Sequence, residues 1–417
     1  MKALTIKGQK QLSGTIRISG AKNSAVALIP AAILSDEETT ICNVPEITDV
    51  NALSEILEYL NADVRRASES IVINPANIEN KTITEEHSKK LRASYYFLGA
   101  LLGKYKKASM YFPGGCSIGK RPIDLHLKGF EALGAKITTK GNCYVIEAEE
   151  LRGNDIYLNI ASVGATINIM LAAVKAKGTT VIRNAAKEPE IVNTAIFLNN
   201  MGAKITGAGT SKIKIEGVEH LHGCFHEVIP DRIEAGTYLI IGALCAKELK
   251  VTNVIPKHLE ALISKLEDMG VELEVDVDSV IVKKPSKYKK TNIKTLVYPG
   301  FPTDLQQPFT VLLTQAEGIS KVEETIYENR FMHIPYLNKM GAKITTDKMI
   351  ATVEGPTELV GCKVEATDLR AGSAMIAAAL IASGETTITK VEHILRGYEN
   401  IVEKLTDIGA NIELKEI

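Results

Sequence analysis

The sequence predicts an α/β protein of two domains, each built from three copies of one structural unit. The chain has 417 residues, which exceeds a single compact core, so two domains of roughly 200 residues are expected. One phrase, a helix end followed by Gly-Ala and a strand, recurs six times in strict or looser form. A second phrase, a helix of small apolar residues followed by a β-rich run, keeps the same period.

The first phrase places glycine, or asparagine in the first copy, where each helix ends. These positions are 73, 68, 68, 71 and 68 residues apart, which gives the length of the unit. Glycine and asparagine adopt the left-handed conformation that ends a helix and lets the chain turn into a strand. The six positions are Asn61, Gly134, Gly202, Gly270, Gly341 and Gly409.

The second phrase supplies two kinds of helix in each unit. The small-residue helix is apolar nearly all round, so it is predicted to be buried. The helix after each β-rich run is amphipathic, as in residues 53–60 and 259–266, where apolar residues recur every three or four positions. Each unit should therefore run strand, helix, strand, helix and two strands. The small-residue helices start near Ser24, Ala93, Gly164, Ala235, Leu305 and Ala371.

The domain boundary is expected where Pro230 interrupts the pattern between the third and fourth units. We expect an N-terminal domain over residues 22–229 and a C-terminal domain formed by residues 1–21 with 230–417. The first strand, expected from Leu4 to Ile18, precedes the first small-residue helix and should join the C-terminal domain. The chain would then cross between the domains near residues 20–22 and 228–232, and two such crossings form a hinge.

Composition excludes several classes of protein. A formal net charge of −1 argues against bulk nucleic-acid binding. No apolar run reaches the ~20 residues of a membrane span, and the start of the chain does not resemble a signal peptide, so a cytoplasmic protein is expected. Six scattered cysteines without a C-x-x-C pair suggest neither zinc nor a disulfide framework. No Walker loop, Rossmann fingerprint or metal motif occurs, so no cofactor or metal is required.

Residues 113–122 form the most distinctive stretch. Cys116 follows two glycines, precedes Gly119, and is close to the cations Lys120 and Arg121. Adjacent cations favour the thiolate and lower a cysteine pKa from its usual ~8.5. The stretch is interpreted as a reactive cysteine on a mobile anion-binding lid, and a glycine turn with an incidental cysteine is the alternative. Cys42, Cys143, Cys245 and Cys362 lie in apolar or strand-like surroundings and are expected to be inert.

Basic residues recur at similar places in the repeat. Lys22 opens the first small-residue helix, where backbone N–H groups and the helix dipole favour an anion, although a solvated lysine is the alternative. Arg92 and Arg370 lie at the start of other small-residue helices, and Arg396 follows the last β-rich run. With Arg121 they suggest an anion-lined cleft between the domains, since arginine suits phosphate and carboxylate.

Asp304 lies at the start of the small-residue helix of the fifth unit. It is interpreted either as a helix N-cap or as a general base that faces the cationic cleft. His126 and His333 are expected to have structural or substrate-orienting roles.

Six stretches of the chain resemble, in order and end to end, the UDP-N-acetylglucosamine 1-carboxyvinyltransferases, the enolpyruvyl transferases of peptidoglycan synthesis. The resemblance implies an inside-out α/β barrel pair built from six βαβαββ repeats, the fold shared with 5-enolpyruvylshikimate-3-phosphate synthase. Lys120 stands at a position that the family leaves variable. The matching stretches are residues 19–24, 113–126, 231–236, 301–306, 328–333 and 368–372.

The resemblance also implies a reaction. The enolpyruvyl group of phosphoenolpyruvate moves to the 3′-hydroxyl of UDP-N-acetylglucosamine, and phosphate leaves. Cys116 would be the general acid and the target of fosfomycin, and Asp304 the base. Lys22, Arg121, Arg370 and Arg396 would hold phosphoenolpyruvate, with Lys22 and Arg396 also counted as catalytic. The remaining contacts implied are Asn23 to phosphoenolpyruvate, and Arg92, Arg121, Pro122, Ile123, Asp124, Leu125, Asp304 and Ile326 to the UDP-sugar.

Two alternatives remain open. The sister enzyme acting on shikimate 3-phosphate shares the implied fold and a basic cleft, but it does not resemble residues 113–121. A non-catalytic regulatory protein on the same scaffold is the second alternative. The presence of Lys22, Cys116, Asp304 and Arg396 together favours an enzyme.

Overall fold

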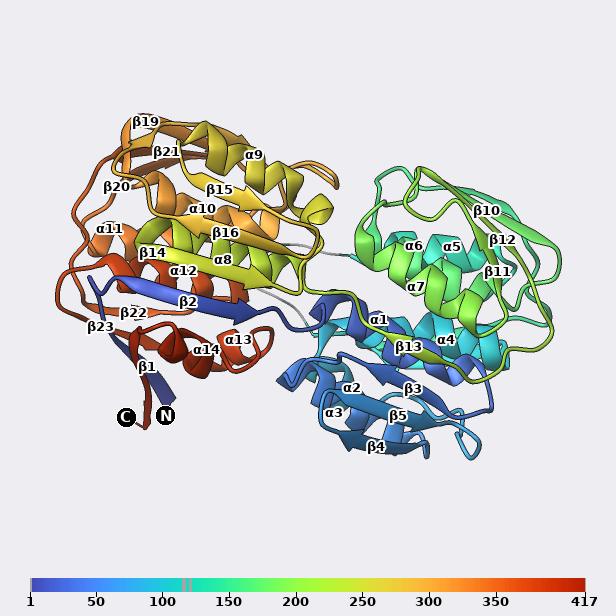
Figure 1. Ribbon diagram of the computed structural model, residues 1–417. Coiled ribbons are helices and arrows are strands. Elements are labelled where there is room, and N and C mark those ends of the chain that lie inside the picture. Colours follow the sequence, from blue (N-terminus) through green and yellow to red (C-terminus); the bar gives the residue numbers. More distant parts are fainter. Residues whose placement is uncertain (1, 115–117, 120–121, 417) are drawn as a thin grey trace. The chain divides into compact units, whose positions relative to one another are not determined.

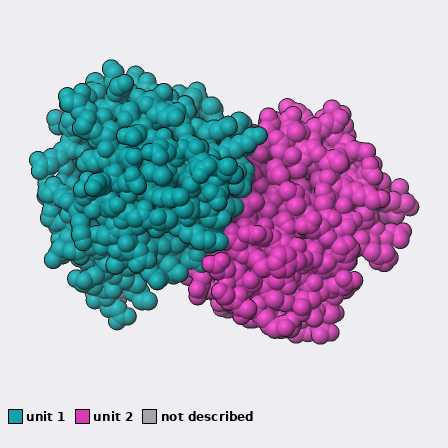
Figure 2. All heavy atoms as spheres, in the orientation of Figure 1, with its two compact units in different colours: residues 1–19, 117–120, 230–417 teal, residues 20–116, 121–229 magenta. Residues whose placement is uncertain are grey.

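The computed structural model is a mixed α/β protein, as the sequence predicted (Figure 1). It describes residues 2–114, 118–119 and 122–416. The chain divides into two compact units, coloured separately in Figure 2. Unit 1 comprises residues 1–19, 117–120 and 230–417, and unit 2 comprises residues 20–116 and 121–229.

The described residues of unit 2 form three sheets, with the strand orders β13-β3-β5-β4, β6-β8-β7 and β11-β12-β10-β9. Its strands are β3 (Thr39–Cys42), β4 (Asp63–Ala67), β5 (Ser70–Asn74), β6 (Lys107–Tyr111), β7 (Lys136–Lys140), β8 (Cys143–Glu147), β9 (Asp155–Tyr157), β10 (Thr179–Arg183), β11 (Lys204–Thr206), β12 (Lys212–Glu216) and β13 (Phe225–Glu227). Its helices are α1 (Lys22–Ala31), α2 (Thr48–Tyr59), α3 (Glu85–Lys90), α4 (Tyr96–Tyr105), α5 (Asp124–Ala132), α6 (Val163–Ala173) and α7 (Pro189–Asn200), with 3₁₀ turns η1 (Ala32–Leu34) and η2 (Arg92–Tyr95).

Unit 1 contains three further sheets, with the strand orders β22-β23-β1-β24, β15-β16-β14-β2 and β17-β19-β21-β20, and β18 also pairs with β19. Its strands are β1 (Lys2–Lys7), β2 (Leu12–Arg17), β14 (Ala246–Thr252), β15 (Glu272–Val275), β16 (Ser279–Lys283), β17 (Tyr288–Lys289), β18 (Ile293–Lys294), β19 (Ala316–Glu323), β20 (Lys343–Asp347), β21 (Ile350–Gly355), β22 (Lys363–Glu365), β23 (Glu385–Thr389) and β24 (Asn411–Glu416). Its helices are α8 (Arg232–Cys245), α9 (Glu260–Asp268), α10 (Thr303–Leu313), α11 (Ile334–Lys339), α12 (Leu369–Ile381), α13 (Glu392–Leu395) and α14 (Ile401–Asp407), with the 3₁₀ turn η3 (Pro256–Leu259).

Five of the described sheets share one pairing pattern. A central strand pairs in parallel with one neighbour and antiparallel with the next, as β10 does with β9 and β12. The same holds for β3, β14, β19 and β23. In the sixth sheet β6 pairs antiparallel with β8, and a single parallel bridge joins Ile83 to Met110. Strand β12 alternates exposed Lys and buried Ile, so its sheet has one face in water and one on the core.

The small-residue helices are buried, as predicted. In unit 1, α8, α10 and α12 pack against one another, and the sheets of that unit surround them (Figure 1). In unit 2, α4 packs against both α1 and α6. Nearly every residue of these helices is shielded from water, because residues such as alanine and glycine let helices approach closely. The amphipathic helices α2 and α9 also form where predicted.

The predicted left-handed residues at the helix ends are confirmed at all six positions. Asn61 has φ +71°, and the five glycines have φ between +85° and +109°. The backbone reverses there from helix to strand, and a residue with a β-carbon other than asparagine would be strained.

The predicted first strand is wrong. Residues 4–18 form two strands, β1 and β2, which belong to different sheets of unit 1. The break lies at Gly8 and Gln9, where Gln9 has φ +61°. A β-carbon on Gly8 would lie 2.2 Å from the carbonyl oxygen of Ala382, so the chain passes too close to α12 for a side chain there.

Apart from the short stretch of residues 117–120, which groups with unit 1, the chain passes from one unit to the other at residues 19–20 and 229–230. On the unit 1 side, the Asp231 N–H donates to the Ser19 carbonyl at 2.9 Å. On the unit 2 side, the Ala21 N–H donates to the Ile229 carbonyl at 2.7 Å. Among the described residues, no helix is long and apolar enough to cross a membrane.

Candidate active site

Asp304 lies in the first turn of α10, and its carboxylate is held by two buried arginines. Arg330 Nη2 donates to Asp304 Oδ1 at 2.5 Å, and Arg370 Nη2 donates to Oδ2 at 3.2 Å. The arginine side chains are only 3% and 5% exposed, whereas the Asp304 side chain is 27% exposed. Asp304 is the second residue of α10, and Pro302 is the N-cap residue of that helix. The interpretation of Asp304 as the N-cap is therefore wrong. The two arginines orient its carboxylate, and part of the side chain remains accessible to solvent.

Arg370 connects this carboxylate to a buried hydroxyl pair. Its Nη1 donates to Tyr398 Oη at 3.2 Å, and that hydroxyl lies 2.9 Å from Thr237 Oγ1. Burial by itself would lower the pKa of Arg370, but the Asp304 carboxylate, together with Tyr398 and Asp231, outweighs burial and raises it. The guanidinium therefore stays charged, and its position is fixed from two sides.

Lys22 is the first residue of α1, and it is not a solvated lysine. Its Nζ lies 2.7 Å from Asp49 Oδ2 in the first turn of α2, and the two side chains are 13% and 3% exposed. The neighbouring Asn23 is half-buried in the same turn of α1. Unit 2 thus presents a nearly buried cation at a helix N-terminus, where the dipole adds to its attraction for anions.

Arg92 lies in the 3₁₀ turn that precedes α4, with its guanidinium carbon 6.0 Å from the ring centroid of Tyr95. The Tyr95 ring in turn makes an edge contact with His126. Burial lowers the pKa of His126 to about 3, and the positive charge of Arg92 adds to this effect. His126 is therefore neutral near pH 7, which suits the structural or orienting role expected of it.

The proton of His126 can be placed from its neighbour Asn168. Asn168 Oδ1 accepts from the Gly99 N–H at 2.8 Å, which leaves its Nδ2 as the donor to Tyr95 O and to His126 Nδ1, each at 2.9 Å. The proton therefore sits on Nε2 of the imidazole. This network fixes the start of α5, where Pro122 and Asp124 are exposed, Leu125 is half-buried and Ile123 is buried.

Cys116 and Arg121 lie outside the described residues. The two described residues between them, Ile118 and Gly119, group with unit 1. The Asn329 N–H donates to the Ile118 carbonyl at 3.0 Å. Gly119 has φ +146°, and a β-carbon there would lie 2.2 Å from Glu328 Oε2. The backbone conformation therefore favours glycine where this stretch meets residues 328–329, whereas the Glu328 carboxylate, at the end of a flexible side chain, can move away.

The other predicted residues of unit 1 lie on separate segments. Ile326 follows β19 and is half-buried, and its N–H donates to Glu324 Oε1 at 2.8 Å. Arg396 directly follows α13 and is half-buried. His333 is fully buried beside Arg330, and burial lowers its pKa to about 4. A neutral, inaccessible His333 does not transfer protons to a substrate.

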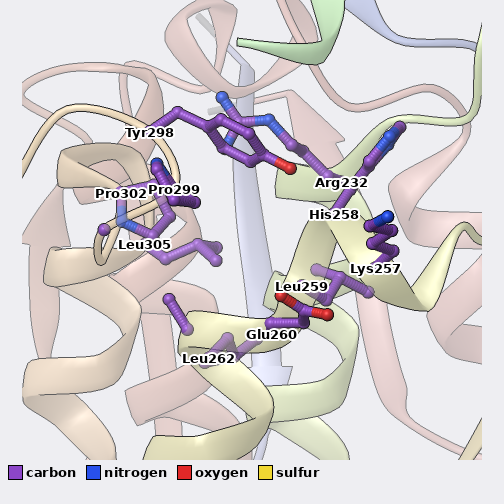
Figure 3. A pocket seen from close by; sticks show the side chains of 12 residues that line it. Arg232, Lys257, His258, Leu259, Glu260, Leu262, Tyr298, Pro299, Pro302 and Leu305 are labelled. Atoms are coloured by element: carbon purple, nitrogen blue, oxygen red, sulfur yellow. The ribbon is translucent and has the colours of Figure 1, made fainter. Parts of the chain in front are cut away.

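A separate pocket lies beside the start of α10, and its lining includes Arg232, His258 and Tyr298 (Figure 3). Arg232 lies over the ring of Tyr298 there, with 5.5 Å between the guanidinium carbon and the ring centroid. Burial lowers the pKa of His258 to about 4, and the charges of Arg232 and Lys257 add to it. None of the described residues predicted for the site lines this pocket.

The other cysteines do not show the lowered pKa that is expected for Cys116. All five are free, and Cys143 and Cys245 are buried. Burial raises the pKa of Cys224 to about 11 and that of Cys245 to about 12, so both are thiols at neutral pH. No group of three or more His, Cys, Asp or Glu residues is arranged to hold a metal in the part of the chain that the structure describes.

Comparison with known proteins decides the family. The model of the EPSP synthase (3-phosphoshikimate 1-carboxyvinyltransferase) family matches residues 6–405. The chain belongs to the enolpyruvyl transferase family. Within it, the chain is 56% identical over 409 residues to UDP-N-acetylglucosamine 1-carboxyvinyltransferase 2 of Listeria monocytogenes serotype 4b, covering 98% of this chain and 97% of that protein. A protein of the same name from Bacillus anthracis is 56% identical over 413 residues, covering 99% of this chain and 96% of that protein.

Solved structures of enolpyruvyl transferases share the fold. NikO of Streptomyces tendae matches with a TM-score of 0.90 and 26% identity over 99% of both chains. EPSP synthase of Acinetobacter baumannii matches with a TM-score of 0.78 over 100% of both chains, and at 19% identity this shows the fold alone.

Four residues that hold the predicted site residues within their own units were not predicted from the sequence. Arg330 and Tyr398 hold Asp304 and Arg370, Asp49 pairs with Lys22, and Glu324 binds the Ile326 backbone. Arg330 lies inside a stretch that the sequence had singled out, residues 328–333, so its role could have been suspected. Tyr398 and Asp49 carry no local signal, because their partners lie 28 and 27 positions away in the sequence. Glu324 binds backbone two positions away, but its hydroxyl partners Thr295 and Thr303 lie 29 and 21 positions away.

Proposed function

We propose that this chain transfers the enolpyruvyl group of phosphoenolpyruvate to the 3′-hydroxyl of UDP-N-acetylglucosamine and releases phosphate, the first committed step of peptidoglycan synthesis. The observation that carries the proposal is the 56% identity, over 98% of the chain, to a Listeria protein named for this activity. The oriented, accessible carboxylate of Asp304 supports it, because the reaction needs a base at the sugar hydroxyl.

The proposed steps balance as an addition followed by an elimination. Cys116 protonates C3 of phosphoenolpyruvate, which makes C2 electrophilic. The 3′-oxygen then bonds to C2 while Asp304 takes the hydroxyl proton. Before the elimination Asp304 releases that proton to solvent, and the Cys116 thiolate takes up a proton from solvent. In the elimination the ionised Asp304 removes a proton from C3, the C2–O bond to phosphate breaks, and inorganic phosphate leaves. Charge develops in both steps, and preorganised cations stabilise it.

The cations are assigned to phosphoenolpyruvate, which carries both a phosphate and a carboxylate. Lys22, Arg121, Arg370 and Arg396 are proposed to bind it, with Asn23 beside Lys22. Lys22 and Arg370 are supported by their burial, since a nearly dry cation binds an anion more strongly than a hydrated one. Arg92 and residues 121–125, with Asp304 and Ile326, are proposed to bind the UDP-sugar.

The proposed site draws on both units. Lys22, Arg92 and residues 122–125 belong to unit 2, whereas Asp304, Arg370 and Arg396 belong to unit 1. We therefore propose that the substrates bind in a cleft between two domains that close on them. Each domain is proposed to hold three βαβαββ repeats in an inside-out barrel, which the shared pairing of five sheets supports. An unchanged radius of gyration in solution scattering on adding UDP-N-acetylglucosamine would contradict closure.

Phosphate release from phosphoenolpyruvate tests the activity. Wild type and Cys116→Ser would each be assayed with UDP-N-acetylglucosamine or shikimate 3-phosphate as the acceptor. We expect release only with the UDP-sugar, and a sharp loss in the variant. Release with shikimate 3-phosphate would assign the chain to the sister activity, and no release with either acceptor would leave a regulatory protein.

A further inference from the structure

Glu324 is a buried carboxylate that the proposed mechanism does not use. It directly follows β19 and is 1% exposed. In the described part of the chain its partners are two hydroxyls and two backbone N–H groups, with no lysine or arginine among them. Burial of a carboxylate is costly unless hydrogen bonds replace its hydration. We therefore expect this carboxylate to hold the segments that supply these hydroxyls and N–H groups in fixed positions.

The partners come from three segments of unit 1. Thr295 lies just after β18, and its Oγ1 donates to Glu324 Oε1 at 2.8 Å. The same oxygen accepts from the N–H groups of Ile326 and Tyr327, at 2.8 and 3.3 Å. Glu324 Oε2 accepts from Thr303 Oγ1 at 2.9 Å, and Thr303 is the first residue of α10. One side chain thus ties the turn after β19 to the start of α10.

A second set of bonds stiffens this turn. Thr295 Oγ1 accepts from the Thr325 N–H at 2.8 Å, and Thr325 Oγ1 donates to the Thr295 carbonyl at 2.5 Å. Since the hydroxyl of Thr295 donates to Glu324 and accepts from Thr325, its orientation is fixed. The turn of residues 325–327 is therefore held at both its backbone and its side chains.

These tethers lie next to the residues assigned to the UDP-sugar. Thr303 immediately precedes Asp304, and the Ile326 backbone is bound directly. The chain then leads from this turn to Arg330, whose guanidinium orients the Asp304 carboxylate. Glu324 therefore supports both the backbone of Asp304 and the segment that carries its arginine partner.

We propose that Glu324 is a positioning residue for the acceptor half of the site. It sets the separation between the Asp304 carboxylate and the Ile326 contact, and so places the sugar hydroxyl against its base. This proposal rests on the proposed function. It assigns Glu324 no contact with the substrate and no proton transfer.

The positioning role requires a hydrogen-bond acceptor at the place of Glu324 Oε1. Glu324→Gln keeps this acceptor and Glu324→Ala removes it, so the two substitutions should differ in effect. In Glu324→Gln the amide oxygen can still accept at the Oε1 position, and the Thr303 hydroxyl can turn to accept from the amide nitrogen. In Glu324→Ala the two backbone N–H groups and both hydroxyls lose their acceptor. Gln should therefore rescue much of what Ala loses.

Steady-state kinetics of these variants test the proposal. For Glu324→Ala we expect KM for UDP-N-acetylglucosamine to rise about tenfold and kcat to fall up to about 10²-fold, the effect of a misplacement of about 1 Å. KM for phosphoenolpyruvate should change by less, since Arg370, one of its assigned ligands, is held by Tyr398 as well as by Asp304. Thr303→Val, which removes only the Oε2 donor, should show a milder change of the same kind.

Tyr288→Phe is the matched control. Tyr288 lies on β17 of the same sheet, and its buried hydroxyl donates to the Ala243 carbonyl at 2.7 Å. Its loss should lower the melting temperature and leave both KM values unchanged. If Glu324→Ala does not fold, Thr303→Val carries the test.

Two results would overturn the proposal. One is an unchanged KM for the sugar in all three variants; the other is an equal loss for both substrates that follows the melting temperature, as in the control. Measurements on the wild type distinguish a failure of the positioning role from a failure of the proposed enzymatic function. A wild type that neither binds UDP-N-acetylglucosamine in calorimetry nor turns it over refutes the proposed function, and the positioning role with it. An active wild type with unaffected variants refutes the positioning role alone.

Discussion

Glu234 should make the stability of unit 1 depend on pH. It lies in the first turn of α8, where its side chain is 3% exposed and the Lys404 side chain is 17% exposed. Lys404 Nζ lies 2.6 Å from Oε1, and the Ser19 N–H donates to Oε2 at 2.8 Å. Burial raises the pKa of Glu234 from 4.5 to about 7, although Lys404 counteracts part of this effect.

The sign follows from proton binding in the two states. Between pH 4.5 and about 7 the folded protein holds a proton on Glu234 that the unfolded chain has lost. The free energy of unfolding therefore falls as pH rises through this range and levels off above it. The difference between the two pKa values corresponds to about 3 kcal/mol.

Glu234→Gln removes this titration and leaves Lys404 charged throughout the range. We therefore expect the variant to gain stability relative to wild type as pH rises from 5 to 8. For a unit of this size about 3 kcal/mol corresponds to roughly 6–12 °C in melting temperature. Thermal melts followed by circular dichroism at four pH values would measure the change in the difference between the two proteins.

Glu413→Gln is the control for removing a carboxylate. Glu413 lies on β24 of the same unit, and its side chain is 61% exposed. We expect its melting curve to follow that of wild type at every pH. If the profiles of wild type and Glu234→Gln run parallel from pH 5 to 8, the inference that burial raises this pKa is wrong.

The remaining predictions concern His126, Asp304 and the cysteines. Because the folded pKa of His126 is about 3, the unfolded chain alone binds its proton below about pH 6.5, and stability is lost as pH falls. Wild type should therefore lose about 2 kcal/mol relative to His126→Phe between pH 7 and 5, measured by thermal melts, and a constant difference would contradict this. Asp304→Asn should lower kcat by about 10²–10⁴, measured by phosphate release, and a wild-type rate would remove Asp304 from the mechanism. Fosfomycin should alkylate Cys116 but not Cys224 or Cys245, whose burial raises their pKa values. Mass spectrometry would detect the adduct, and an unmodified Cys116 peptide would refute the assignment.

The sequence predicted the features that depend on local conformation. Asn61 and the five helix-ending glycines adopt positive φ because few other residues do so without strain. The small-residue helices are buried because they offer no polar face to water. The residues at helix starts, Lys22 and Asp304, were placed correctly by the same repeat.

The sequence also supported a resemblance that the comparisons bear out at the level of the family and of the named relatives. Long motifs in a fixed order carry this information without any knowledge of the fold. The break between β1 and β2 was missed because it depends on a carbonyl of Ala382, which lies 374 positions further along the chain than Gly8.

Only the tertiary structure decided how the site residues are held. Asp304 meets Arg330 and Arg370 across 26 and 66 residues of sequence, and Lys22 meets Asp49 across the α1–α2 connection. Glu324 gathers donors from three segments in the same way. Local sequence fixes φ and ψ and the apolar pattern, but the partner of a buried charge depends on which elements pack side by side. The packing of these elements brings Arg330 and Arg370 to Asp304 and so orients its carboxylate.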